Sequence, residues 1–428
     1  MYSNLIKTFR DPKSDLKNFI LFCSGQFVSL FGTSVYSFAI SLYILTVTGS
    51  GLSFATNLVL SILPTVILGP VAGVLTDRLN RKMIIVGTDL ISGIVLLILF
   101  IVSFVQFNLI WIYAVTLILN ILSTLFSVCS ESAKPNIVKE KNLMKMNAIS
   151  RMILSASFIL GPVLGGIVYA FIDIKTFILI NAFSFMISGM SELFINFKFN
   201  VEEKKDKSEK IKIFSDMKDG LIFLFNQKNL LGMMILFIFI NFFSTFSVVV
   251  PVPYILTNVI ELSSVSFGII EASFSVGMLL GAIVVSKLND RLMEYNKLLT
   301  LLTFISSILI LLMGAPLLIF SFEYKLFYTI YYSLIHMTYG VVIAFVDIPV
   351  MTMLQKLVPD ELRGRVISVA ISIVKVFVPL AMITSGSVLN VIPAFWLPLT
   401  GGGCLLIITL RYYYVDILKQ PSLKTQET

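Results

Sequence analysis

Three ionisable side chains fall inside apolar runs of the sequence, where they could bind and release protons. Glu271, His336 and Lys375 each stand well inside such a run. Their depth is roughly 6 to 10 residues, or about 9 to 15 Å at ~1.5 Å per helical residue. An unpaired charge at this depth in a membrane costs several kcal/mol, so each group has to face water, pair or become neutral. All three are therefore candidates for proton coupling.

Glu271 is the first candidate for a proton carrier. Partial burial favours the neutral form of a carboxyl group, and a substrate or Lys375 beside it would favour the charged form again. The alternative is a structural ion pair between Glu271 and Lys375 that never changes its protonation. His336 is the only histidine and titrates in the physiological range, but a lone histidine among tyrosines is more often a packing residue. Asp89 and Asp347 lie nearer the inner ends of their runs. Both are expected to join charge networks there, and neither is expected to be the proton site.

A charged hairpin between two apolar runs has the residue types of a gate. Gly69, Gly73 and Asp77 follow one another at intervals of four residues, and Arg78 and Arg81 follow Asp77. Small residues four apart allow close helix packing, and an acid among bases can hold one arrangement of helix ends.

The expected partners of this hairpin come from two other loops. Asp77 would meet the amino-terminal end of the apolar run that follows Arg363 and Arg365, and Arg78 would reach Glu131. Alternatively, the charges only fix the topology of the chain in the membrane.

A second cluster of small residues contains a proline. Gly161, Pro162, Gly165 and Gly166 fall within one apolar run. Proline removes a helix hydrogen bond and glycine removes a side chain, so this helix can bend and lie close to a helix of the other half of the chain. A plain kink without a coupling role is the alternative.

Four polar residues in apolar runs are candidates for lining a substrate cavity. They are Gln26, Tyr36, Asn120 and Asn241. The chain also has 36 Phe, 17 Met and 15 Tyr residues, which suit a soft apolar pocket for a bulky amphipathic substrate. Lipid-facing helices use Phe and Met equally, so this support is weak.

The elements that position these residues are predicted to be membrane-spanning helices. The sequence is 57% hydrophobic and 13% charged, with a mean hydropathy of +0.95, whereas soluble domains carry about a quarter charged residues. Its 428 residues allow about twelve spans of ~20 residues. The predicted spans are 18–47, 52–75, 83–104, 109–130, 146–171, 174–197, 230–256, 265–288, 298–320, 326–351, 366–391 and 394–410.

A lysine-rich segment divides these spans into two sets of six. The predicted organisation is an N-terminal half at 1–197, a cytoplasmic linker with an amphipathic helix at 198–228, a C-terminal half at 229–415 and a cytoplasmic tail at 416–428. With both termini inside, all of the 32 Lys and Arg residues except Lys175, Lys325 and Lys375 fall on the inner side, as the positive-inside rule requires. The net charge of +8 thus reflects sidedness and does not indicate nucleic-acid binding.

Traces of a repeat relate the two halves. Pro162 corresponds to Pro379, and Gly277 and Gly281 echo Gly69 and Gly73. The fold class predicted is an all-α membrane protein with twelve transmembrane helices in two six-helix pseudo-repeats. Two such halves around a central path form a rocker with a site at their interface.

Several motifs resemble those of the major facilitator superfamily. The hairpin Asp77-Arg78-Leu79-Asn80-Arg81-Lys82 resembles the loop between helices 2 and 3 of that family, and Gly161-Pro162-Val163-Leu164-Gly165-Gly166 resembles its antiporter motif. Val358-Pro359-Asp360-Glu361-Leu362-Arg363-Gly364-Arg365-Val366 and Asp219-Gly220-Leu221 are similar to the branch with macrolide efflux proteins and the enterobactin exporter. The resemblance implies proton-driven export of a small-molecule substrate by alternating access, in the cell membrane, by a monomer without a cofactor.

Other functions have little support in the sequence. It contains neither G-x-x-x-x-G-K-[ST] nor H-E-x-x-H, so ATP hydrolysis and zinc catalysis are not expected. Cys23, Cys129 and Cys404 fall within separate spans and are expected to pack as small apolar residues. We expect neither an enzyme nor a metal site. The alternatives within this fold are a lysophospholipid flippase, a siderophore or metabolite transporter, and a transport-inactive sensor or scaffold.

Overall fold

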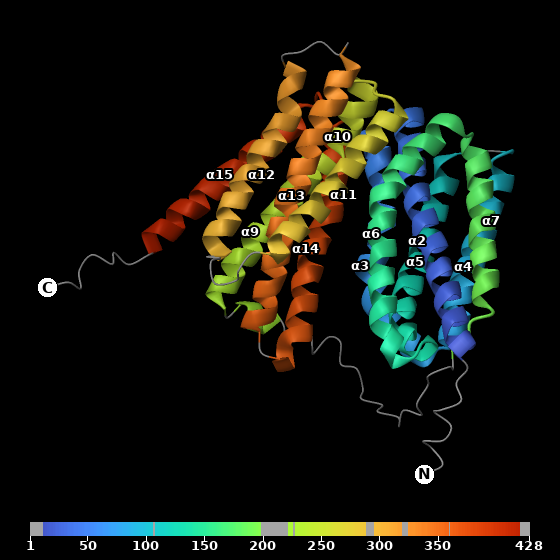
Figure 1. Ribbon diagram of the computed structural model, residues 1–428. Coiled ribbons are helices and arrows are strands. Elements are labelled where there is room, and N and C mark those ends of the chain that lie inside the picture. Colours follow the sequence, from blue (N-terminus) through green and yellow to red (C-terminus); the bar gives the residue numbers. More distant parts are fainter. Residues whose placement is uncertain are drawn as a thin grey trace. The chain divides into compact units, whose positions relative to one another are not determined.

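Each of the predicted spans is helical in the computed structural model (Figure 1). The structure describes residues 12–105, 108–197, 221–225, 227–287, 295–318, 324–358 and 360–419. The helices of the first half are α2 (Pro12–Thr48), α3 (Gly51–Arg78), α4 (Arg81–Val102), α5 (Leu109–Ile137), α6 (Glu140–Phe171) and α7 (Ile174–Glu192). Those of the second half are α9 (Lys228–Ser244), α10 (Pro251–Tyr254), α11 (Ser264–Ser286), α12 (Tyr295–Gly314), α13 (Lys325–Leu357), α14 (Asp360–Val388) and α15 (Trp396–Lys419).

The all-α membrane fold predicted from the sequence is confirmed. In the described ranges, eleven helical segments are long and apolar enough to cross a membrane, and α15 is a further long helix that continues past the predicted end of the last span. No strand occurs in the same ranges. The chain is therefore a multi-pass membrane protein. Most of the predicted linker and the end of the predicted tail lie outside the described residues.

Polar residues at the ends of the apolar runs fix where the helices begin. The side chains of Asn80, Asn108, Asp173 and Ser263 each accept a hydrogen bond from a backbone N–H in the first turn of α4, α5, α7 and α11. These side chains satisfy amide groups that have no partner within the helix. The first turn of α6 is capped from a distance, because Asp15 of α2 accepts a 3.0 Å hydrogen bond from the Lys139 amide.

The seventh span is not a regular helix. Between α9 and α10 lies a π-helical turn, η2 (Thr245–Val249), and a second one, η3 (Ile255–Val259), follows α10. Pro251 and Pro253 stand between them and cannot donate the backbone hydrogen bonds of a regular helix. Such π-turns widen a helix locally and often occur at functional sites.

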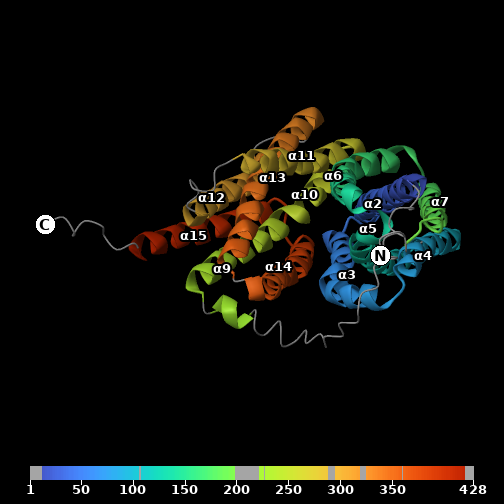
Figure 2. The same cartoon turned by 60° about the horizontal axis from the view of Figure 1, so that its bottom comes forward.

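The chain divides into two units by its internal contacts. The N-terminal unit comprises Met1–Thr48 and Thr56–Glu209, and the C-terminal unit comprises Gly49–Ala55 and Lys210–Thr428. In the N-terminal unit α2 packs chiefly on α6 and α7, and α4 packs on α7 and α5 (Figures 1 and 2). In the C-terminal unit the largest interfaces join α11 to α13 and α12 to α15. Each unit thus has its own set of buried helix faces.

Candidate functional site: a polar cavity in the C-terminal unit

A cavity of about 270 Å³ lies within the C-terminal unit between the α9–η2 segment, α11 and α13. Its lining residues recur every three or four positions along α9–η2 and along α13, so one face of each helix faces the cavity. The lining consists of Ile240, Asn241, Ser244, Thr245, Val248, Val249, Glu271, Phe274, His336, Tyr339, Ile343 and Asp347. Two carboxyl groups and one imidazole therefore share a chamber with other polar and with apolar side chains.

Glu271 reaches this cavity from the first half of α11. Its side chain is partly buried, and the described residues provide no hydrogen-bond or ion-pair partner for its carboxyl group. Lys375 lies on α14, outside the cavity lining, and its side chain is exposed. Among the described residues, the ion pair between Glu271 and Lys375 considered from the sequence is absent, so the Glu271 carboxyl group is available to a proton or a ligand.

His336 lines the same cavity, and the backbone fixes its tautomer. Its Nδ1 atom lies 3.0 Å from the carbonyl oxygen of Tyr332, one helical turn earlier. Because a carbonyl group only accepts hydrogen bonds, Nδ1 carries the hydrogen, and Nε2 of the neutral ring remains an acceptor. One turn further along α13, Tyr339 donates a 2.6 Å hydrogen bond to Ser244 of α9 and so ties two walls of the cavity together.

Glycines bring α11 and α13 close enough to form one wall of the cavity. A Cβ atom added to Gly277 would overlap the Met337 carbonyl group, and one added to Gly340 would overlap the carbonyl group of Phe274. Neither overlap could be relieved by turning a side chain, because backbone atoms are involved. The backbones therefore meet directly beside Phe274, which lines the cavity.

Asp347 and Tyr339 are two of the several lining residues that were not among the cavity residues predicted from the sequence. Asp347 stands eleven residues after His336, which corresponds to about three helical turns and places it on the same helix face. This spacing could have placed Asp347 at the cavity, although Asp347 was expected in a charge network at the inner face. Tyr339 is one of the tyrosines that surround His336 in the sequence.

The other three predicted cavity residues lie in the N-terminal unit. Tyr36 is 2% exposed within the apolar core between α2, α4, α5 and α7. Gln26 is also buried, and its Oε1 atom has no hydrogen-bond partner in the described chain. Asn120 is partly buried and donates to the Thr116 carbonyl group at 2.8 Å. Asn241, the fourth, lines the C-terminal cavity.

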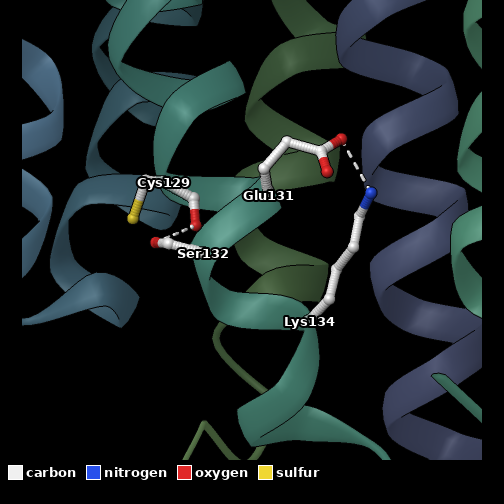
Figure 3. A network of polar contacts seen from close by, with 4 residues as sticks. All are labelled: Cys129, Glu131, Ser132 and Lys134. Carbon is white, nitrogen blue, oxygen red and sulfur yellow. Dashed lines mark hydrogen bonds and ion pairs between the residues drawn. The ribbon is translucent and has the colours of Figure 1, made fainter. Parts of the chain in front are cut away.

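Only part of the predicted gate can be described. Six of the predicted positions fall within α3 or α14, but their side chains or surroundings lie outside the described part of the structure. They are Asp77, Arg78, Arg363, Arg365, Gly69 and Gly73. Among the described side chains, Glu131 is exposed and forms a 2.7 Å ion pair with Lys134 one turn later on α5 (Figure 3). The backbone oxygen of Arg81 accepts a hydrogen bond from the Cys129 thiol at 3.6 Å, which joins α4 to α5.

The Gly161 and Gly165 face of α6 contacts α2 of its own unit. A Cβ atom at Gly161 would overlap the Ser34 hydroxyl group, and one at Gly165 would lie 2.8 Å from the Phe38 ring. Pro162 lies inside α6, and Gly166 is buried. These small residues account for the extensive packing of α6 on α2.

No group of three or more His, Cys, Asp and Glu side chains suited to a metal ion occurs in the part of the chain that the structure describes. The cavity instead offers hydrogen bonding, proton binding and apolar contact. An organic ligand fits this chemistry better than an ion that needs several fixed ligands.

Comparison with known proteins assigns this architecture to a family. Residues 22–382 match the family model described as Major Facilitator Superfamily. Macrolide efflux protein A of Streptococcus pyogenes is 25% identical over 370 residues, which cover 85% of this chain and 87% of the relative. Macrolide efflux protein A of Enterococcus faecalis is 26% identical over 263 residues, covering 60% of this chain and 77% of that protein.

Solved structures share the fold at low sequence identity. The nucleoside transporter NupG is 16% identical with a TM-score of 0.64, and the match covers 95% of this chain and 99% of that one. A bacterial homologue of the iron transporter ferroportin, in an inward-facing state, is 14% identical with a TM-score of 0.67 over 93% and 98% of the two chains. These likenesses concern the fold alone.

Proposed function

Because the chain belongs to the Major Facilitator Superfamily of transporters, we propose that it exports hydrophobic or amphipathic small molecules from the cell in exchange for protons. The similarity to two macrolide efflux proteins supports export of bulky organic compounds. In this proposal both termini are cytoplasmic, the protein acts as a monomer, and the two halves give access to each side of the membrane in turn.

The observation that carries the proposal is the unpaired Glu271 carboxyl group in a cavity that combines polar and apolar side chains. Ile240, Val248 and Phe274 supply apolar surface, while Glu271 and Asp347 supply negative charge when ionised. A ligand with an apolar body and one protonated amine complements both features. Cationic amphipathic compounds are therefore the favoured substrates within the proposed class.

Competition at this carboxyl group gives a simple exchange. A protonated Glu271 is neutral and has no strong attraction for a cation. When a cationic substrate binds, the Glu271 proton leaves to solvent and the carboxylate pairs with the substrate cation. When a proton returns, the ion pair is lost and the substrate is released. Charge and protons balance in each step, and only one of the two ligands occupies the carboxylate at a time.

The test is proton-driven transport of a fluorescent cationic dye and of a macrolide by the full-length protein in liposomes. We expect Glu271→Gln to lower the initial rate by roughly tenfold or more, since couplings between sites are typically about 1–3 kcal/mol. Glu261→Gln is the matched control, because Glu261 is an exposed glutamate in the same unit that does not line the cavity, and it should transport like the unaltered protein.

Two results would contradict the proposal. Translocation of lysophospholipid without dependence on a proton gradient would instead indicate a flippase. If the unaltered protein transported no compound but still bound another protein, it would be a sensor or scaffold.

A further inference from the structure

A second pair of acids lies buried in the N-terminal unit, outside the cavity described above. Asp89 on α4 is 2% exposed, and Glu192, the last residue of α7, is 0% exposed. A Cβ atom added to Gly189, three residues before Glu192, would lie 3.2 Å from the backbone nitrogen of Leu90, the residue after Asp89. The two acids therefore stand on packed turns of α4 and α7. Two ionised carboxyl groups close together and away from solvent would destabilise the folded protein, because like charges at short range in an apolar interior repel.

The hydrogen bonds around the pair are uneven. Ser29 of α2 donates a 2.6 Å hydrogen bond to Asp89, and the Ser29 hydroxyl lies 3.4 Å from that of Ser188, one turn before Glu192. In contrast, both carboxyl oxygens of Glu192 are buried without a hydrogen-bond partner in the described part of the chain. Asp89 is thus solvated by a hydroxyl group, whereas Glu192 is not.

Glycine makes the space that Glu192 occupies. A Cβ atom on Gly25 of α2 would lie 2.5 Å from the Glu192 Oε1 atom, and one on Gly189 would lie 2.9 Å from the Leu90 side chain. Gly93 of α4 likewise meets the Ala182 carbonyl group at 2.9 Å from its added Cβ. Close packing of α2, α4 and α7 therefore surrounds the acids, and water has little access to them.

The charged and titratable groups on the packed helices leave the pair uncompensated. The Lys82 ammonium group of α4 donates to the backbone oxygen of Leu193, and Lys134 of α5 pairs with Glu131. Lys17 of α2 lies over the Phe194 ring, with its Nζ atom 5.9 Å from the ring centre. On α7, Glu192 is the buried ionisable residue among those described. No described cation forms an ion pair with Asp89 or Glu192.

We propose that Glu192 holds a proton against Asp89, so that the two carboxyl groups form a second proton-binding site in the N-terminal unit. A neutral Glu192 avoids the cost of a bare buried anion on a helix turn packed beside Asp89. A role for this site in coupling rests on the proposed function, whereas proton binding itself can be measured without transport.

The first experiment is infrared spectroscopy of the full-length protein in liposomes, in which a protonated acid and a carboxylate absorb at different frequencies. It uses the Glu271→Gln variant as background, so that Glu271 contributes nothing. We expect a carboxylic-acid band at neutral pH that disappears when Glu192→Gln is added and that stays when Glu261→Gln is added instead. If Glu192→Gln left the spectrum unchanged, the proposal would be overturned. The role of Glu271 in transport is tested separately by the transport assay.

Thermal unfolding as a function of pH provides a second readout. If the folded protein holds a proton that an unfolded glutamate releases at neutral pH, the folded state binds more protons, and stability falls as pH rises. Glu192→Gln resembles the protonated acid in shape but cannot titrate. This variant should therefore lose the part of the slope that begins above the pKa of an unfolded glutamate, about 4.3, and should be at least as stable as the unaltered protein near neutral pH.

Two outcomes of the unfolding experiment would overturn the proposal. One is an unchanged slope in Glu192→Gln. The other is stabilisation of the unaltered protein by Na⁺ or K⁺, but not by choline, that Glu192→Gln abolishes, because a metal cation would then occupy the place assigned to the proton.

Discussion

Individual side chains determine which acids this protein can bury. Glu271 faces a cavity, Asp89 accepts from Ser29, and Glu192 fits against Gly25 without a hydrogen-bond partner in the described chain. A buried carboxyl group without a donor is one of the costlier groups in a protein interior. Its environment therefore indicates a need for a proton or a ligand more directly than its position in the sequence does.

The space at Gly25 predicts a specific effect of one added methyl group. Gly25→Ala should lower the stability of the folded protein by about 1–3 kcal/mol, because its Cβ atom would displace the packed Glu192 side chain. Gly87→Ala in α4 is the control, since a Cβ atom there meets nothing within 4 Å. Thermal unfolding of both variants measures the difference, and equal melting temperatures would show that the Glu192 environment is not tightly packed.

At the scale of helices, the α11–α13 contact positions the cavity. Gly340→Ala would push its methyl group into the Phe274 carbonyl group, so we expect both lower thermal stability and weaker dye binding. Gly403→Ala on α15 is the control, because its Cβ atom would lie in open space. Fluorescence titration of the purified variants tests this, and unchanged affinity in Gly340→Ala would mean that the helix spacing does not define the site.

The charged hairpin that begins at the end of α3 is proposed to act as a gate and not as part of the binding site. We therefore expect Asp77→Asn to slow transport several-fold while leaving dye affinity nearly unchanged. Transport and equilibrium binding have to be measured on the same preparation. A large loss of affinity in this variant, with transport reduced only in proportion, would assign Asp77 to ligand binding instead.

Helix positions were predictable from the sequence because the bilayer imposes one rule on every span. Runs of about twenty apolar residues bounded by Asn80, Asn108, Asp173 or Ser263 mark the helices well. The π-turns at 245–249 and 255–259 were not predicted, although Pro251 and Pro253 mark the irregularity.

The candidate site was only partly predictable. Glu271, His336 and Asn241 were expected near a cavity because polar groups are costly in lipid. The separation of Lys375 from Glu271 depends on how α14 is rotated about its axis. The burial of Glu192 depends on Gly25 in a distant segment. The spacing of residues within one helix does not reveal either the position of Lys375 or the burial of Glu192.

At the scale of the whole molecule, each unit contains its own pair of acids inside its helices. The C-terminal unit has Glu271 and Asp347 at a cavity, and the N-terminal unit has Asp89 and Glu192 between packed helices. In the proposed cycle the cavity exchanges substrate for a proton, and the Asp89 and Glu192 pair holds a further proton in the N-terminal unit. The substrate-bound and substrate-free states of such a transporter differ in the charge of the Glu271 carboxyl group, and this difference can shift the balance between its conformations.

Counting the protons released when a ligand binds tests the central claim most directly. The full-length protein is mixed with a cationic dye in weakly buffered detergent solution, and a pH indicator records the protons displaced per bound dye. We predict release of protons by the unaltered protein and by Glu261→Gln, and no release by Glu271→Gln at equal dye occupancy. Binding without proton release in the unaltered protein, or undiminished release in Glu271→Gln, would contradict exchange at the Glu271 carboxyl group.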